Sequence, residues 1–424
     1  MSKLSTESYK GVRDFYPEDK FIQNYIFGVM RSTVESFGYS EYDASILEPA
    51  ELYKAKSGEE IVNEQTYTFT DRGEREVTLR PEMTPTVARM VAARSRELTF
   101  PLRWYSIPNL FRYEKPQRGR LREHWQLNVD LFGATGVSAD AEVITVAYMV
   151  MKNLGAKDDD FTIKLNSRKL LQDLFAIFAL DAEQSQRVTK LLDKKEKLDP
   201  SDFTTGITEV IGDKAEKFVA LVSSNENLLE QLTDKDSAKD LINLIEILSA
   251  QGVKNVEFVP SITRGFDYYT GMVFEVFDTN PENSRALFGG GRYDDLLDMF
   301  GVDKVPTVGF GMGDVTATDF LAVRNLLPTY HSPAELYICV LKSDYVSNAT
   351  ALAHALRAEH VNVSIDLSGK KVGDQIKIAD KQKIPYILVI GEDEIKTDMY
   401  TLKNLETGVE EKLDIAGIVA KLKK

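Results

Sequence analysis

The segment LFRYEKPQRGRLREHWQLNVDLFG constrains the fold more than any other part of the sequence. Two strand-like runs, 102–112 and 123–133, flank a basic, glycine-containing loop, and this pattern predicts a β-hairpin. Alternate side chains of a strand share one face. The polar residues that share a face on these two runs are Arg112, Glu114, His124, Gln126, Asn128 and Asp130. Burying them in an apolar core would be costly, so the hairpin predicts the floor of a polar site.

Strand signals and helix signals alternate in an order that predicts an α+β fold. Residues 17–36 form an amphipathic pattern that begins at Pro17 and stops before Gly38, which predicts a helix. A second helix is expected over 84–98. Residues 168–250 carry apolar side chains at helical spacing, and strand signals return afterwards in VEFVP, MVFEVF and TVGFGMG. A mainly antiparallel sheet domain with a helical insertion is therefore expected.

The C-terminal part of the chain predicts a separate, smaller domain. A linker-like cluster with two prolines, NLLPTYHSP, precedes alternating strand and helix patterns. Such an alternation is typical of a small α/β domain with a mainly parallel sheet. We therefore expect a large domain over 1–325 that is interrupted by the insertion at 168–250, a linker over 326–332, and an α/β domain over 333–424.

The cysteine and histidine content excludes several kinds of site. Cys339 is the one cysteine, so neither an internal disulfide nor a multi-cysteine zinc site is expected. The four histidines show no metal-ligand spacing, and no metal motif is predicted. The N-terminus lacks an apolar leader, and no apolar run approaches the roughly 18 residues of a membrane span. These features predict a cytoplasmic protein without a membrane partner.

The formal net charge of −14 argues by itself against a nucleic-acid partner. The charge is uneven, however. Residues 103–122 carry six basic side chains and one acidic side chain, a local charge of +5. A solvated surface is the simplest interpretation, but a basic segment in an acidic chain also suits an anionic ligand.

Glycine-rich segments raise the possibility of a nucleotide site. No phosphate-binding P-loop motif is present. In VGFGMGDVTATDF, Asp314 occupies the place of the third glycine of a dinucleotide fingerprint, so glycines that allow close strand packing are the better interpretation. Two further segments, TRGFDYYTG and GGGRYDDL, place arginine and tyrosine beside glycines, and TLRPEMTPTVARM places Glu82 and Thr84 before a helix. These groups suit a ligand with an anionic group, a polar ring and an ammonium group.

Several of these segments together resemble the histidyl-tRNA synthetase family of class II aminoacyl-tRNA synthetases. KGVRDFYPED is similar to the N-terminal signature, FGYSEYDASILEP to motif 1 and FRYE…REHWQ to motif 2. TRGFDYYTG and GGGRYDDL look like the two histidine-specific segments, and VGFGMGD stands in the place of motif 3. Residues 333–424 resemble the anticodon-binding domain of the family. The resemblance implies a histidine–tRNA ligase that forms histidyl-adenylate from L-histidine and ATP and transfers histidine to tRNA(His). Motif 1 implies a homodimer, and Mg²⁺ is implied only as the companion of ATP.

The resemblance also implies roles for individual residues. Arg112 and Arg264 match the catalytic arginines that contact the α-phosphate. The histidine-binding positions are Glu82, Met83, Thr84, Arg112, Gln126, Asp130, Arg264, Tyr268, Tyr269 and Tyr293. The ATP-binding positions are Arg112, Glu114, Arg122, His124, Arg264 and Thr316. The tRNA-contacting positions lie on the motif 2 loop and are Lys115, Gln117, Arg118 and Arg120.

Three positions depart from the family pattern. Asp130 stands where the family more often has glutamate. His124 stands where the family commonly has a phenylalanine that stacks on adenine, and Thr316 stands where a motif 3 arginine covers the other face. Arg292 is a candidate to replace that cation, and Asp314 is expected to cap the helix that follows motif 3. Two interpretations stay open. Either ATP binds through rearranged contacts, or the chain is a non-catalytic, histidine-binding regulatory paralogue that acts in histidine biosynthesis.

Overall fold

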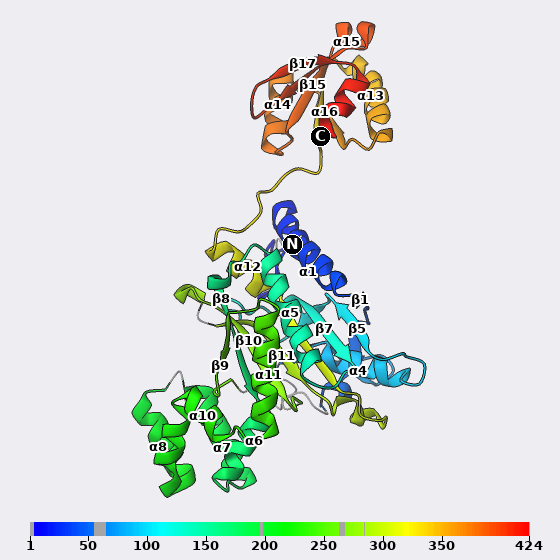
Figure 1. The fold of residues 1–424 in the computed structure, drawn as a ribbon. Coiled ribbons are helices and arrows are strands. Elements are labelled where there is room, and N and C mark those ends of the chain that lie inside the picture. Colours follow the sequence, from blue (N-terminus) through cyan, green and yellow to red (C-terminus); the bar gives the residue numbers. More distant parts are fainter. Residues whose placement is uncertain (1–3, 55–64, 196–197, 263–267, 284, 424) are drawn as a thin grey trace. The chain divides into compact units, whose positions relative to one another are not determined.

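The computed structural model describes the chain over five ranges, residues 4–54, 65–195, 198–262, 268–283 and 285–423. The chain divides into two compact units, residues 1–327 and 328–424 (Figure 1). Each unit has its own apolar core.

A large sheet organises the first unit. Its strands, in sheet order, are β1 (Ser40–Glu41), β5 (Leu102–Ser106), β7 (Glu123–Phe132), β12 (Thr307–Gly313), β11 (Ala286–Arg292), β10 (Met272–Asp278), β8 (Phe161–Ser167) and β9 (Val256–Phe258). The short strand β6 (Asn109–Phe111) also pairs with β7. All neighbouring pairs from β5 to β8 are antiparallel, and the edge pairs β1–β5 and β8–β9 are parallel.

One face of this sheet is covered by helices. They include α1 (Pro17–Ser36), α5 (Val137–Asn153) and α12 (Asp314–Val323). The apolar side chains of β7 that alternate with its polar ones, such as Leu127 and Val129, are fully buried with Ile26, Met30 and Ile144 of these helices. Because the alternate side chains of β7 must then point away from this core, the polar row predicted from the sequence lies on the opposite face.

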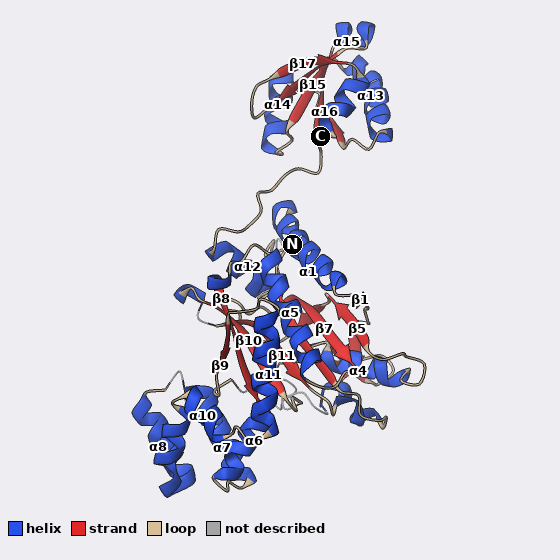
Figure 2. Cartoon of the chain, viewed as in Figure 1, coloured by secondary structure: helices blue, strands red, loops and turns tan. Residues whose placement is uncertain are grey.

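Smaller elements complete the first unit. A second sheet has the strand order β2 (Leu47–Pro49), β4 (Glu76–Leu79) and β3 (Tyr67–Thr70), beside α2 (Glu51–Lys54) and α4 (Thr84–Ala93). The insertion consists of α6 (Arg168–Ile177), α7 (Ala182–Lys194), α8 (Pro200–Ile211), α9 (Ala215–Val222), α10 (Asn225–Gln231) and α11 (Asp236–Ala250). Helix α11 packs along α5 and against β8, which joins the insertion to the sheet (Figure 2).

The second unit is a five-stranded sheet with helices around it. Its strand order is β14 (Val363–Ile365), β13 (Leu336–Val340), β15 (Tyr386–Ile390), β16 (Tyr400–Asn404) and β17 (Glu410–Leu413). The helices are α13 (Val346–Ala358), α14 (Val372–Lys381), α15 (Glu392–Thr397) and α16 (Ile415–Leu422). The three strands from β14 to β15 are parallel, whereas β16 and β17 form an antiparallel hairpin.

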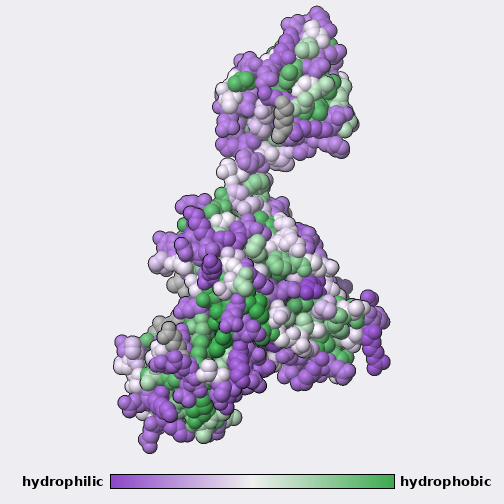
Figure 3. Space-filling model, in the orientation of Figure 1, coloured by the Kyte–Doolittle hydropathy of each residue, from purple (hydrophilic) through white to green (hydrophobic). Residues whose placement is uncertain are grey.

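Most of the predicted elements are present. The predicted helix over 17–36 is confirmed, because α1 spans Pro17–Ser36. The helix expected over 84–98 ends earlier, at Ala93, where the chain enters a turn. No helix in the described part of the chain is long and apolar enough to cross a membrane. The visible face of both units is mostly hydrophilic (Figure 3).

Candidate active site

A polar cavity of about 120 Å³ lies on the open face of β7, β12 and β11. It gathers side chains that are up to 228 positions apart in the sequence, counting from Glu82 to Phe310. The residues with polar side chains that line it are Glu82, Thr84, Arg112, Gln126, Asn128, Asp130, Tyr268, Tyr269 and Tyr293. Eight of these nine were predicted to bind histidine, and Asn128 was missed even though its place on the polar face of the hairpin was predicted. Met83 does not line the cavity, because its side chain is fully buried in the protein.

Gly309 and Gly311 of β12 leave the space that the side chains lining this cavity occupy. Gly309 pairs with Asp130, and a Cβ atom added at Gly309 would lie 2.5 Å from Asp130 Oδ1. A Cβ atom at Gly311 would lie 2.2 Å from Gln126 Nε2. Side chains from β7 thus lean across β12, and a larger residue at Gly309 or Gly311 would displace them. The glycine-rich segment is therefore the floor of a binding site and not merely a place of close strand packing.

Asp130 lies at the bottom of the cavity, where it is 4% exposed. Its burial raises the pKa of its carboxyl group to about 7, against an opposing effect of the hydrogen bond that Tyr293 donates. Burial and the neighbouring Asp130 raise the pKa of the Tyr293 hydroxyl well above its usual value, so this tyrosine stays a hydrogen-bond donor. The pair therefore places a carboxyl group and a hydroxyl donor side by side at the bottom of the cavity.

The opposite wall of the cavity comes from the start of α4 and from the segment before β10. The Tyr268 hydroxyl donates to Glu82 Oε2 at 3.4 Å. Tyr268 and Tyr269 pack ring to ring at 4.9 Å, and both contact the ring of Tyr293. A carboxylate, a hydroxyl and three phenol groups therefore surround a volume suited to a small polar molecule with an aromatic ring.

A second cavity, of about 180 Å³, adjoins the first and shares Arg112, Gln126 and Gly311 with it. The other lining residues are Glu114, Gly119, Arg120, Leu121, His124, Leu287, Gly313, Val315 and Thr316. Three of the residues predicted to bind ATP, besides Arg112, thus lie here, namely Glu114, His124 and Thr316. Arg112 stands at the junction of the two cavities, and its Nε donates to the carbonyl oxygen of Pro81 at 2.9 Å.

The charges in the second cavity are set by burial and by pairing. Burial, with smaller effects from Arg112 and Arg13, lowers the pKa of His124 to about 3, so its imidazole is neutral near pH 7. Glu114 accepts a hydrogen bond from Arg120 Nη1 at 3.3 Å. The Thr316 hydroxyl donates to the carbonyl oxygen of Leu287 at 2.7 Å. We predicted Arg120 only as a tRNA contact, and we missed the apolar lining residues Leu121, Leu287 and Val315.

Arg122 does not line either cavity, contrary to its prediction as an ATP-binding residue. Its side chain turns toward the N-terminal segment, where Nη1 donates to the Tyr9 hydroxyl at 3.0 Å. Its guanidinium group also stacks on the ring of Tyr113, 4.0 Å from the ring centre. The chain before β7 does not continue the strand, so the alternation that points His124 to the cavity does not extend to Arg122.

Among the described residues, the predicted tRNA contacts other than Arg120 do not line either cavity. Arg264 is outside the described residues. The predicted tRNA contacts occupy the loop between β6 and β7, and all four side chains are exposed there: Lys115, Gln117, Arg118 and Arg120. Backbone hydrogen bonds between Gln117 and Arg120 close the tip of this loop.

Asp314 does not cap α12, contrary to prediction. Gly313 occupies the cap position, and Asp314 is the first residue of the helix. Its buried carboxylate accepts hydrogen bonds from the backbone N–H of Trp125 at 3.0 Å and from Arg13 Nη2 at 2.8 Å. Asp314 therefore ties the start of α12 to β7 and to the N-terminal segment.

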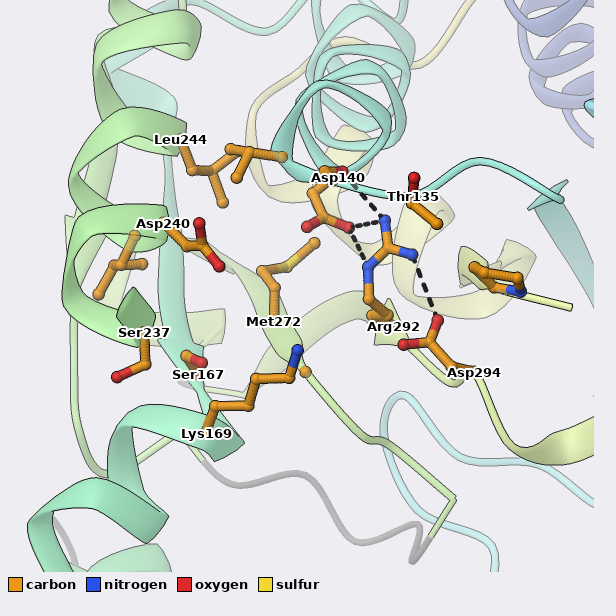
Figure 4. A pocket seen from close by; sticks show the side chains of 15 residues that line it. Thr135, Asp140, Ser167, Lys169, Ser237, Asp240, Leu244, Met272, Arg292 and Asp294 are labelled. Atoms are coloured by element: carbon orange, nitrogen blue, oxygen red, sulfur yellow. Dashed lines mark hydrogen bonds and ion pairs between the residues drawn. The ribbon is translucent and has the colours of Figure 1, made fainter. Parts of the chain in front are cut away.

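Arg292 cannot replace the missing motif 3 cation, because its side chain points away from both cavities. It lies beside a third cavity, of about 220 Å³, between the sheet and the insertion (Figure 4). Its guanidinium group is paired with Asp140 at 2.7 Å and with Asp294 at 3.3 Å. It also donates to the carbonyl oxygens of Ala134 and Gly136. Arg292 thus holds β11 to the start of α5, and the adjacent Tyr293 points to the opposite side of the chain, into the first cavity.

An antiparallel sheet that carries two joined polar cavities on its open face, together with a small α/β unit, defines a class II aminoacyl-tRNA synthetase catalytic domain and an anticodon-binding domain. The family model for histidyl-tRNA synthetase matches residues 11–314, and the model for the anticodon-binding domain matches residues 335–424. The chain belongs to the histidyl-tRNA synthetase family.

Curated relatives and solved structures agree with this assignment. A histidine–tRNA ligase of Leptospira biflexa is 44% identical over 95% of this chain and 94% of its own length. A histidine–tRNA ligase of Thermoplasma volcanium is 35% identical over 99% of both chains. The fold matches the histidyl-tRNA synthetase of Nostoc sp. PCC 7120 with a TM-score of 0.86, at 22% identity over 99% of both chains.

Proposed function

We propose that the protein is a histidine–tRNA ligase that activates histidine with ATP and then transfers it to tRNA(His). The observation that carries this proposal is the pair of joined cavities that share Arg112, Gln126 and Gly311. Two substrates that react with each other need adjoining sites with a charged group at the junction. The first cavity takes histidine and the second takes ATP.

Histidine would be held at both of its ends. Glu82, Thr84 and Gln126 receive its ammonium group, because a carboxylate, a hydroxyl and an amide oxygen can all accept hydrogen bonds. The two ring nitrogens form hydrogen bonds with Asp130, Tyr268 and Tyr269, and these bonds have fixed directions. Tyr293 orients Asp130 through the hydrogen bond that it donates. Asp130 is shorter than a glutamate, and Gly309 compensates for this by letting its carboxylate lie across β12.

The reaction joins a carboxylate oxygen of histidine to the α-phosphorus of ATP, and pyrophosphate leaves. Negative charge builds on the phosphoryl oxygens in the transition state, and a fixed cation aimed at them lowers the barrier. Arg112 lines both cavities, which supports this role for it, and we propose that Arg264 assists it. Mg²⁺ would enter with the triphosphate of ATP.

The motif 2 loop and the second unit would bind tRNA. We propose that the exposed side chains Lys115, Gln117, Arg118 and Arg120 approach the acceptor end, since basic groups meet phosphates even in a chain of net charge −14. Residues 333–424 would read the anticodon, residues 1–325 with the insertion at 168–250 would carry the chemistry, and 326–332 would link them. The protein would work in the cytoplasm.

A regulatory paralogue that binds histidine without activating it is the alternative. The fold also matches a protein of Bacillus halodurans C titled as an ATP phosphoribosyltransferase regulatory subunit/histidyl-tRNA synthetase, with a TM-score of 0.76 at 24% identity, over 92% of this chain and 99% of that one. The curated relatives that match this chain over 95% and 99% of its length are histidine–tRNA ligases, and this favours the ligase.

Histidine-dependent exchange of pyrophosphate into ATP tests the proposal. The purified protein should catalyse this exchange with histidine and not with other amino acids, and it should charge tRNA(His) in a second assay. A folded protein that binds histidine but catalyses no exchange would establish the regulatory alternative.

We also propose that two copies of the chain form a dimer. Besides the resemblance to motif 1, the small three-stranded sheet leaves Leu47 and Phe69 about half exposed, at 44% and 48%. Such side chains are common at interfaces between copies of a chain. Light scattering at micromolar concentration should give twice the chain mass of 47.7 kDa, and a monomer mass would contradict the proposal.

A further inference from the structure

The second cavity has the shape of a slot whose floor is β12. In the sheet, β12 lies between β7 and β11. Gly311 and Gly313 of β12 line the cavity without side chains, while His124 of β7 and Leu287 of β11 line it from either side. Neighbouring strands are about 4.8 Å apart, so two walls on alternate strands stand about 10 Å apart at the backbone. A flat ring fits between side chains at that separation.

The wall opposite His124 is aliphatic. Leu287 is 6% exposed, and Val315 and Thr316 at the start of α12 line the same cavity. The Thr316 hydroxyl is turned to the backbone, since it donates to the carbonyl oxygen of Leu287. Its methyl group faces the motif 2 loop, because Thr316 Cγ2 is the atom nearest to a Cβ built on Gly119, at 3.7 Å. Gly119 and Thr316 both line the second cavity, so this methyl group lies at the edge of the cavity, between α12 and the motif 2 loop.

Two arginines near the start of α12 have carboxylate partners. Arg120 pairs with Glu114, and Arg13 pairs with Asp314. Arg292 is held by Asp140 on the other side of the sheet. These pairings hold their guanidinium groups to carboxylates and so oppose their use as a cover for a purine ring.

We propose that Leu287, Val315 and the methyl group of Thr316 cover one face of the adenine ring, while the imidazole of His124 lies against the other face. This inference rests on the proposed function, since it takes the second cavity as the ATP site. Van der Waals contacts with these side chains then hold the adenine base. They take the place of the motif 3 arginine, where this chain has Thr316. Thr316 is accordingly a binding residue through its methyl group, not its hydroxyl.

A matched pair of variants separates the two groups of Thr316. Thr316→Ser removes the methyl group and keeps the hydroxyl, whereas Thr316→Val keeps a methyl group and removes the hydroxyl. We expect Thr316→Ser to raise the KM for ATP about fourfold, as for the loss of one buried methyl group. Thr316→Val should raise the KM for ATP less than Thr316→Ser does, because the lost hydrogen bond runs to the backbone of Leu287 and not to the ring. The KM for histidine should stay unchanged in both variants.

The opposite pattern would overturn the inference. If Thr316→Val raises the KM for ATP and Thr316→Ser does not, the hydroxyl carries the effect by holding α12 to Leu287. Unchanged KM values in both variants would show that Thr316 does not cover the base. Either outcome leaves the proposed function intact, as long as the wild-type protein catalyses pyrophosphate exchange. Absence of exchange in the wild-type protein would instead refute the proposed function.

Discussion

Replacing Arg112 with alanine should lower the kcat of histidine-dependent pyrophosphate exchange by about 10²- to 10³-fold. This is the loss typical of removing one fixed group that stabilises charge in the transition state. Arg112 lines both cavities, and its Nε donates to the carbonyl oxygen of Pro81, so its guanidinium group is held at the junction of the two cavities. Exchange at saturating ATP and histidine measures the effect.

A second arginine of the same sheet provides the control. Arg103 lies on β5 and pairs with Glu142 at 2.7 Å, away from both cavities. Arg103→Ala should leave kcat near the wild-type value, because Arg103 lines neither cavity. The variant should also stay folded, because partly exposed ion pairs contribute about 1 kcal/mol or less to stability. Equal losses of kcat in the two variants, or none in Arg112→Ala, would contradict the role of Arg112 at the junction.

Replacing Asp130 with asparagine should weaken histidine binding and stabilise the empty protein at the same time. Loss of a charged hydrogen-bond acceptor for the imidazole should lower histidine affinity about 10- to 100-fold. The effect on stability follows from the pKa of Asp130, which is about 7 in the folded protein and about 4 in an unfolded chain. Between these pH values the folded protein keeps a proton that the unfolded chain loses.

This proton fixes the direction in which the free energy of unfolding changes with pH. The stabilisation that goes with the protonated carboxyl group is complete below about pH 4 and is lost as the pH rises through about 7. The asparagine side chain has no such proton to lose, so the free energy of unfolding of Asp130→Asn should exceed that of the wild-type protein more at pH 8 than at pH 5. Between pH 5 and pH 8 this excess should grow by at most about 3 kcal/mol, because about 2 pKa units separate pH 5 from the folded pKa, at about 1.4 kcal/mol each.

Urea unfolding at the two pH values, without histidine, measures this difference. Asp303→Asn is the matched control, because Asp303 is exposed and makes no hydrogen bond or ion pair with other described residues. A difference between Asp130→Asn and the wild-type protein that does not change with pH would contradict the titration of Asp130. In that case the Asp130 carboxylate would not lower the free energy of unfolding at pH 8.

Local patterns were sufficient to predict most of the fold and much of the site. The helix at 17–36 follows from Pro17 and from an apolar stripe, both of which are local features. The polar face of β7 follows from alternation alone, and it placed His124, Gln126 and Asp130 correctly in the cavities. The prediction failed where the alternation stops, since Arg122 precedes the strand and turns to Tyr9.

Contacts between distant segments could not be predicted in this way. Asp314 is an ordinary helix-capping residue by its position, but its partners are Arg13, 301 positions away, and the backbone of Trp125. Arg292 likewise has a buried partner, Asp140, which lies at the start of a different helix. No pattern within either segment reveals these pairs, because packing of the whole domain brings them together. The aliphatic wall of the second cavity was missed for the same reason.

The glycine floor of β12 also limits how the specificity of this enzyme could be changed. No substitution on the open face of β12 can reshape the amino-acid cavity alone, because a Cβ at Gly309 or Gly311 would first displace Asp130 or Gln126. Any engineering toward a different amino acid must work through the side chains of the neighbouring strands. Libraries for directed evolution should hold the VGFGMG segment fixed and vary the positions on β7 and in the segment before β10.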